Sequence, residues 1–385
     1  MELLGPGVYI EHKESGTRPI QAVGTSRAAF LGVAPLAKAD PLQMVAVTNY
    51  RAFTDRFVGD AARSTDLSRA VHGFFQNGGG RCVIVNLGAT QDLQKGLDLL
   101  RTTDDVQIVA APGMCQFEHY EALLTHCAAM GDRMAILDAP EKVDDLARLT
   151  RAGSGGGGGG AEAKVGLGPT RDDKGYAAIY FPWIRTRDPI DNAEVVVPPS
   201  GHVAGVYART DGTRGVHKAP ANEPVRGATG LAYAIDSQQQ KALNDNGVNV
   251  IRYFADRGIL IWGARTVAPA ASPYRYVNVR RLVTMIAESI ARNTRWIVFE
   301  PNDERLWKLI RRDVTAFLMG VWRDGALRGT TPELAFYVKC DEETNPQDSI
   351  DQGKVVVQIG LAPVKPAEFV IFQISQDAGG REVTS

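Results

Sequence analysis

The order of apolar and polar positions divides the chain into two parts. Through the first two thirds, short β-rich apolar runs alternate with helical stretches. The strand-like runs cover residues 28–33, 82–87, 106–110, 134–137, 177–181, 248–253 and 259–262. The helical stretches lie around residues 66–77, 92–102, 116–130, 141–151 and 236–246. This alternation predicts an α/β domain with a mixed, largely parallel sheet.

From residue 274 onward the pattern changes to a smaller α+β domain. A first amphipathic helix is indicated by apolar residues at helical spacing: Val279, Leu282, Val283, Ile286 and Ile290. The run PNDE at residues 301–304 predicts the start of a second helix, with Asn302 as its N-cap and acids in the first turn. Two strand-like runs, residues 355–359 and 369–374, follow these helices.

The second helix has one basic side and one apolar side. Lys308, Arg311 and Arg312 fall along one stripe, opposite the apolar positions. Such a stripe is usually a solvated face, although it is also suited to dock an acidic partner. Asp313 falls beside the apolar face, so we expect an arginine partner for it, with two candidates, Arg280 and Arg281.

A polyglycine run interrupts the α/β part. The sequence GSGGGGGG at residues 153–160 cannot hold a helix or strand and predicts a flexible loop. The run is compatible both with a natural low-complexity loop and with an engineered segment. Because α/β signals resume at Tyr176, we place this loop inside the domain rather than at a boundary.

Composition and charge narrow the class of protein. The chain has 385 residues, of which 44% are apolar and 23% charged, so it can form two domains with substantial cores. A net charge of −1 gives no bulk attraction to nucleic acid or to an anionic membrane. No apolar stretch approaches the roughly 20 residues needed to span a bilayer. The N-terminal sequence lacks the features of a signal peptide, and we expect folding in the cytosol.

Motifs for catalysis or cofactor binding are not found. The sequence lacks GxxxxGK[ST], HExxH and GxSxG, and no GxGxxG leads from a predicted strand into a helix. Gly78–Gly80 follow a predicted helix, where a C-cap explains them. Asp138 ends a predicted strand, a place where α/β enzymes often keep catalytic groups. We favour a structural carboxylate that pairs with Arg133 or caps the next helix. No cofactor and no catalytic residue is therefore expected.

The four cysteines, Cys82, Cys115, Cys127 and Cys340, form no CxxC pair. Cys115, His119 and His126 would share a face if residues 116–131 are helical, and they are the one arrangement to weigh as a metal site. A single helix would supply all three ligands, and no fourth is evident. We interpret these residues as core packing.

Both ends of the chain carry strand-like apolar runs. Val8, Tyr9 and Ile10 form the first; the second contains Phe369, Val370, Ile371, Phe372 and Ile374. Exposed strands of this kind are an aggregation hazard unless their edges are paired. From the residues alone, pairing within the same subunit is the favoured interpretation.

Several longer motifs, each weak alone, occur together in one order. They are LGPGVYIEHKESG near the N-terminus, YAAIYFPWIRTRDP, GVNVIRYFADRGILIWGARTVAP, FEPNDERLWKLIRRDV, GALRGTTPE and PAEFVIFQISQ. Together they closely resemble the contractile tail sheath proteins of phages, R-type bacteriocins and related injection systems. The polyglycine loop is the one departure from this resemblance.

The resemblance implies a structural protein rather than an enzyme. It implies a homo-oligomer of stacked hexameric rings around an inner tube, with baseplate and terminator or cap proteins as further partners, and neither nucleic-acid binding nor membrane insertion. Contraction would drive the tube through a target envelope. Such a particle is assembled in the bacterial cytoplasm as part of a phage tail or a released contractile particle. The alternative is an α/β enzyme or small-molecule-binding module with a cleft at the strand C-terminal ends.

The resemblance also implies a division of the chain. Residues 1–25 would be an N-terminal linker arm, 26–272 the outer α/β domain, 273–362 the inner tube-facing domain and 363–385 a C-terminal arm. The two terminal strands would then add to sheets of neighbouring subunits, which replaces the intrasubunit interpretation. The basic stripe of Lys308, Arg311 and Arg312 would face the tube.

Overall fold

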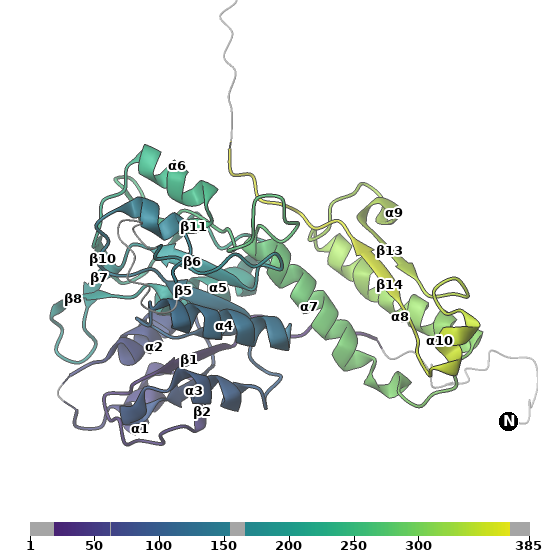
Figure 1. Ribbon diagram of the computed structural model, residues 1–385, viewed down its shortest axis with the longest axis horizontal. Coiled ribbons are helices and arrows are strands. Elements are labelled where there is room, and N and C mark those ends of the chain that lie inside the picture. The colour runs from purple at the N-terminus through teal and green to yellow at the C-terminus, as the bar shows by residue number, and fades with distance from the viewer. Residues whose placement is uncertain (1–18, 62, 155–165, 370–385) are drawn as a thin grey trace, which may run out of the picture.

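The computed structural model describes residues 19–61, 63–154 and 166–369, and over this part of the chain its largest feature is a nine-stranded sheet (Figure 1). The strand order is β2-β3-β1-β4-β5-β6-β11-β12-β9. The strands are β1 (Ala28–Gly32), β2 (Met44–Val47), β3 (Cys82–Asn86), β4 (Ile108–Ala110), β5 (Met134–Asp138), β6 (Ala177–Phe181), β9 (Glu223–Pro224), β11 (Val248–Phe254) and β12 (Gly258–Ile261).

The sheet is mixed, as the sequence predicts. The strands from β3 to β11 pair in parallel, whereas β2, β12 and β9 pair antiparallel at the two edges. All seven predicted strands are present, with ends shifted by at most two residues. The strands missed in this part of the chain are short. They are β2 and β9 in the main sheet and the antiparallel sheet of β10 (Ala228–Leu231), β7 (Ile184–Arg187) and β8 (Glu194–Val197).

Helices cover both faces of the main sheet and divide its core in two. In β1, Ala28 and Phe30 belong to one apolar core, whereas Ala29 and Leu31 belong to the other, because side chains alternate along a strand. On the first face lie α1 (Tyr50–Phe57), α2 (Asp66–Gln76) and α5 (Ser200–Arg214). On the second lie α3 (Leu93–Leu100), α4 (Phe117–Met130) and α6 (Ser237–Asp245).

The helix predicted for residues 141–151 is wrong. That segment forms only a short 3-10 helix, Leu146–Thr150. Its backbone oxygens bond elsewhere: the Arg148 oxygen accepts from the Leu167 N–H and the Arg151 oxygen from the Gly168 N–H. These bonds to residues 167 and 168 take the place of the i to i+4 bonds of an α-helix.

Helices α2 and α5 approach each other through glycines. A Cβ on Gly201 would lie 2.3 Å from the Ala70 backbone oxygen, and one on Gly205 would lie 2.5 Å from the Phe74 backbone oxygen. A Cβ on Gly73 would likewise lie 2.3 Å from the His202 ring. Only glycine permits this separation of the two backbones.

A third apolar core lies to one side of the main sheet (Figure 1). It is built from α7 (Val277–Asn293), α8 (Glu304–Arg323), α9 (Pro332–Ala335) and the antiparallel pair β13 (Phe336–Lys339) and β14 (Gln358–Leu361), and α10 (Gln347–Asp351) lies between the two strands in sequence. Ile20, far away in sequence, belongs to the same core.

This part of the chain corrects two predictions. The N-cap of α8 is Asp303, whose Oδ1 accepts from the Leu306 N–H at 2.9 Å. Asn302 instead accepts from the indole N–H of Trp307 at 2.8 Å, which is why it is not the cap. The strand predicted at residues 355–359 begins three residues later, because β14 is set by its register with β13, a strand that the sequence pattern missed.

The glycine contact predicts a matched pair of substitutions. Gly205→Ala should lower the free energy of unfolding by about 1–3 kcal/mol, because the new methyl group must separate α2 from α5. Gly212→Ala on the same helix meets open space and should raise it by about 0.5–1 kcal/mol. Urea denaturation of both variants checks this. Equal effects of the two substitutions would show that the close approach is unimportant.

Candidate assembly interface

A buried ion pair joins α7 to the α/β body. Arg281 donates to both carboxylate oxygens of Asp211 on α5, at 2.9 and 2.6 Å, and to the backbone oxygen of Thr25 at 2.9 Å. The Thr25 hydroxyl donates to Asp211 at 2.6 Å, and the guanidinium lies over the Tyr207 ring. Burial opposes the charge on Arg281, but Asp211 raises its pKa above the ordinary value. Three distant segments therefore meet at one charge pair.

The described residues before β1 lie along α7. The Val23 N–H donates to the Ser289 hydroxyl at 3.0 Å, and the Asn293 amide donates to the Gln21 backbone oxygen at 3.0 Å. Together with buried Ile20, these bonds fix the chain from residue 20 to residue 25 against the helix. The N-terminal segment thus reaches the sheet by way of the third core.

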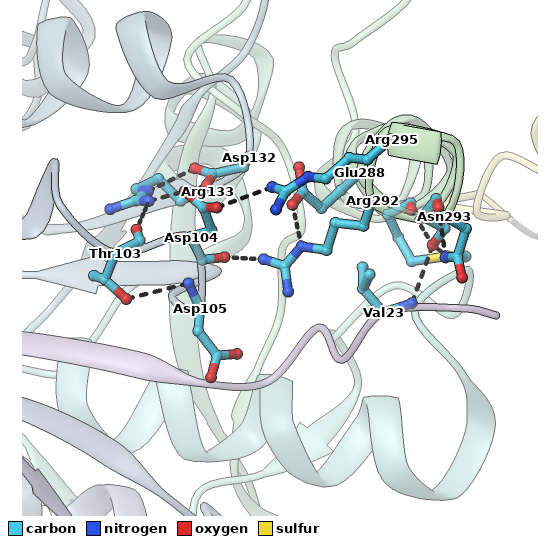
Figure 2. Close-up of polar contacts among 12 residues, drawn as sticks. Val23, Thr103, Asp104, Asp105, Asp132, Arg133, Glu288, Arg292, Asn293 and Arg295 are labelled. Atoms are coloured by element: carbon cyan, nitrogen blue, oxygen red, sulfur yellow. Dashed lines mark hydrogen bonds and ion pairs between the residues drawn. The ribbon is translucent and has the colours of Figure 1, made fainter. Parts of the chain in front are cut away.

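An exposed clasp holds the far half of α7 to the loop after α3 (Figure 2). Arg292 donates to Glu288 and to the backbone oxygen of Asp104. Arg295 pairs with the Asp104 carboxylate at 3.1 Å, and both side chains are largely exposed. Buried Arg133 also holds this loop, because it donates to the Thr103 backbone oxygen at 2.7 Å.

The C-terminal described segment is anchored near the start of α7. Asn278 donates to the Val364 backbone oxygen at 3.1 Å. Arg265, itself buried, binds the Glu368 carboxylate at 2.9 and 2.5 Å, and the Tyr276 hydroxyl donates to it at 3.3 Å. Phe369, directly after this anchor, is 74% exposed. The chain is therefore held up to Glu368 and presents an apolar side chain immediately beyond it.

The β13–β14 pair leaves strand edges open. Within residues 19–61, 63–154 and 166–369, each of these strands pairs only with the other. A groove of about 660 Å³ runs beside β14. Its apolar lining includes Val279, Val283, Ile359, Leu361 and Pro363. An open strand edge beside an apolar groove is suited to receive an additional strand.

The basic stripe on α8 is exposed, as the sequence predicts. Lys308 pairs with Glu304 at 2.7 Å, and Arg312 pairs with Asp313 at 2.9 Å. Arg311 is exposed as well. Acidic neighbours thus offset part of the charge of the stripe.

The expected partner of Asp313 was wrong. Arg312, its neighbour in sequence, binds it instead of Arg280 or Arg281. Arg280 stacks on the rings of Tyr274 and Tyr176, and Arg281 is taken by Asp211. Both predicted arginines are therefore engaged in other contacts.

Asp138 is a buried structural carboxylate. It accepts from the backbone N–H and hydroxyl of Ser200, both at 2.7 Å, and from the Gly113 N–H at 3.1 Å. Burial raises the pKa of Asp138 to about 7, against the lowering effect of these hydrogen bonds. It caps the start of α5, the next α-helix along the chain, and not the helix expected at residues 141–151, which does not form. The alternative pairing with Arg133 is wrong, because Arg133 binds Asp132 at 2.6 Å.

The possible metal ligands are not brought together. Cys115 precedes α4 and donates to the Ala139 backbone oxygen at 3.5 Å, whereas His126 lies next to the Arg133 guanidinium. Burial, with a contribution from Arg133, lowers the pKa of His126 to about 4. In the part of the chain that the structure describes, no cluster of His, Cys, Asp and Glu is suited to a metal ion. No helix found there is long and apolar enough to cross a membrane.

Most of the predicted arm residues lie outside the described residues. These are Val8, Tyr9, Ile10, Val370, Ile371, Phe372 and Ile374. Three features of this region carry no sequence signal: the Arg281–Asp211 pair, the Arg265–Glu368 pair and the loop between α7 and α8, where Val298 and Phe299 are exposed. The two ion pairs join residues 70 and 103 positions apart, which no periodicity reports.

Anchored segments at residues 20–25 and 364–368, an open strand edge and an adjoining apolar groove are features suited to a subunit that assembles with others. Residues 89–267 match the phage tail sheath protein central domain, and residues 270–377 match the phage tail sheath C-terminal domain. The chain belongs to the phage tail sheath protein family. This is a family of structural proteins, and the alternative of an α/β enzyme finds no support in these comparisons.

Solved sheath structures match almost the whole chain. The sheath of the PVC extracellular contractile injection system in its contracted state is 29% identical, with a TM-score of 0.80 over 98% of this chain and 99% of that one. The contracted helical sheath of the anti-feeding prophage is 31% identical, with a TM-score of 0.78 over 97% and 99% of the two chains.

Curated phage relatives are longer. The tail sheath protein of Vibrio phage KVP40 is 29% identical over 49% of this chain, which spans 28% of that protein's length. The chain also spans less than two thirds of each of the other curated relatives that it matches.

The buried joint predicts a large difference between two arginines. Arg281→Ala leaves Asp211 buried without its partner and should lower the free energy of unfolding by about 3–5 kcal/mol. Arg295→Ala removes an exposed contact with Asp104 and should cost at most about 1 kcal/mol. Guanidinium denaturation of both variants measures the difference. A cost of the same size for both would contradict a joint centred on Arg281.

Proposed function

We propose that the chain is the repeating subunit of a contractile sheath. Subunits polymerise as stacked hexameric rings around an inner tube and contract to drive that tube through a target cell envelope. A baseplate and a terminator or cap protein close the two ends. The observation that carries this proposal is the likeness of nearly the whole chain to subunits of two contracted sheaths. Assembly takes place in the bacterial cytoplasm, and the product is a phage tail or a released particle.

Within the particle, the α/β body of residues 26–272 forms the outer domain and residues 273–362 form the inner, tube-facing domain. Residues 1–25 and 363–385 are the linker arms. The separate third core, with its own helices and strand pair, supports this division. The anchoring of residues 20–25 and 364–368 supports it too, since each arm then has a fixed point next to α7.

The arms connect subunits by adding strands. A two-stranded sheet of four-residue strands is marginal by itself, and its open edges favour further pairing. The apolar runs Val8–Ile10 and Phe369–Ile374 supply such strands to neighbouring subunits, and the groove beside β14 receives their side chains. Exposed Phe369, just past the Glu368 anchor, begins the C-terminal run.

Contraction requires no nucleotide in this proposal. The extended sheath is metastable, and the work comes from new contacts between subunits in the contracted packing. The arms keep the subunits connected while the bodies move. Arg281 and the Asp104 clasp hold each body to its α7, so that movement of the outer domain is passed to the inner domain.

The stripe of Lys308, Arg311 and Arg312 faces acidic groups on the tube. All three side chains are exposed and leave the core on one side of α8. Exposed ion pairs contribute only about 0.2–1 kcal/mol each. Weak contacts of this kind, repeated in every subunit, suit a surface that must release during contraction.

Removal of residues 370–385 tests the arm. This truncation keeps Glu368 on Arg265, so the subunit should remain folded with an unchanged melting temperature. It should fail to polymerise, because the added strand is lost. Analytical ultracentrifugation and negative-stain microscopy, with the full chain as control, give the answer. Full-length sheaths from the truncated chain would refute the arm model.

Reversal of the stripe tests the tube contact. The triple variant Lys308→Glu, Arg311→Glu, Arg312→Glu, co-expressed with the tube, should give empty or prematurely contracted sheaths. The control reverses three exposed cations of the α/β body, Arg51, Lys95 and Arg101, which also have acidic neighbours. The control should leave extended, tube-filled particles. Such particles from the stripe variant as well would mean that the stripe is only solvated.

A further inference from the structure

The loop between α7 and α8 carries an exposed apolar tip, formed by Val298 and Phe299. Phe299 is 102% exposed, and neighbouring Val298 is 63% exposed. The φ angle of Phe299 is +73°, a conformation that bulky residues rarely adopt. Its backbone N–H donates no hydrogen bond within the described residues. The local backbone thus holds a large aromatic side chain in solvent.

A second feature lies at the other end of α7. A groove of about 610 Å³ separates the segment at residues 364–369 from the α/β body. Trp262, Ala264 and Pro366 give it apolar walls, and Arg214, Lys218 and Lys365 give it positive charge. This groove differs from the one beside β14, which lies between α7 and the strand edge.

The groove contains acceptors that lack donors. Asn278 is 1% exposed, and its side-chain oxygen is buried with no hydrogen-bond partner in the described part of the chain. The side-chain oxygen of Asn244 is also buried and has no hydrogen-bond partner among the described residues. A buried acceptor without a partner costs about 1–3 kcal/mol, so a donor entering this groove would be favoured.

We propose that the α7–α8 tip of one subunit inserts into this groove of a second copy of the chain. The Phe299 ring packs against Trp262 and Pro366, and the Phe299 N–H donates to one of the free asparagine oxygens. Glu300, exposed beside the ring, pairs with Lys365 at the rim of the groove. Apolar surface, charge and hydrogen-bonding capacity of the tip therefore all match those of the groove.

The position of the two features sets the type of contact. Asn278 is the second residue of α7, and Phe299 follows the other end of this 17-residue helix, which is about 25 Å long. A subunit cannot fill its own groove with its own tip. Contacts between different patches of identical subunits run head to tail and generate rings or helical arrays. This inference rests on the proposed function, because it requires the chain to polymerise.

Engineered disulfides test the contact directly. Phe299→Cys and Ala367→Cys, combined in one full-length chain, should cross-link under mild oxidation once sheaths have formed. Because each subunit carries one tip and one groove, non-reducing gels should show a ladder of dimers, trimers and longer chains. Each single variant is a control and should give no ladder, since Cys82, Cys127 and Cys340 are buried and the half-buried Cys115 is replaced by serine in every variant. Phe299→Ser should leave the melting temperature unchanged and weaken polymerisation at least several-fold.

The outcomes separate the two proposals. Sheaths that form without a disulfide ladder would overturn the tip contact and leave the sheath function intact. Dimers from Phe299→Cys alone would indicate tip-to-tip pairing and would also overturn it. A wild-type chain that forms no polymer, with or without the tube, would overturn the proposed function and the contact with it.

Discussion

The open edges of β13 and β14 constrain everything else in this subunit. Two strands of four residues cannot satisfy their outward N–H and C=O groups alone, and the apolar groove beside β14 adds exposed surface that favours burial. In the proposed sheath, a strand of another subunit covers this edge. The anchored chain segments at both ends of α7 indicate where such strands start.

Helix α7 links this unsatisfied edge to the large α/β body. Arg281 fixes it to Asp211 in its buried N-terminal part, and Arg292 and Arg295 fix its far end to the loop after α3. The two contacts differ in strength. Loss of one partner of a buried ion pair costs much free energy, because the remaining charge stays buried, whereas loss of an exposed pair costs little. Helix α7 is therefore held firmly to the α/β body at Arg281, whereas its far end, at Arg292 and Arg295, can separate from the body more easily.

The sequence predicted the main sheet well and the surfaces around α7 poorly. Strands such as β3 and β5 are apolar on both faces, and this continuous pattern marks a covered parallel sheet. Helix α5 escaped prediction because it is buried almost all round and contains three glycines, so it shows neither periodicity nor helix propensity. The partners of Arg281 and Arg265 escaped because they depend on folding of segments far apart in the chain. The motif resemblance, by contrast, gave the family without any of these contacts.

The completion of the β13–β14 sheet can be observed directly. A cryo-electron microscopy map of sheaths assembled from this chain would show what lies beside β14. We expect at least one additional strand about 4.8 Å from it, traced to an arm of a neighbouring subunit. A bare β14 edge in the assembled sheath, or an edge covered by the same subunit's own residues 8–10 or 369–374, would contradict assembly by strand exchange.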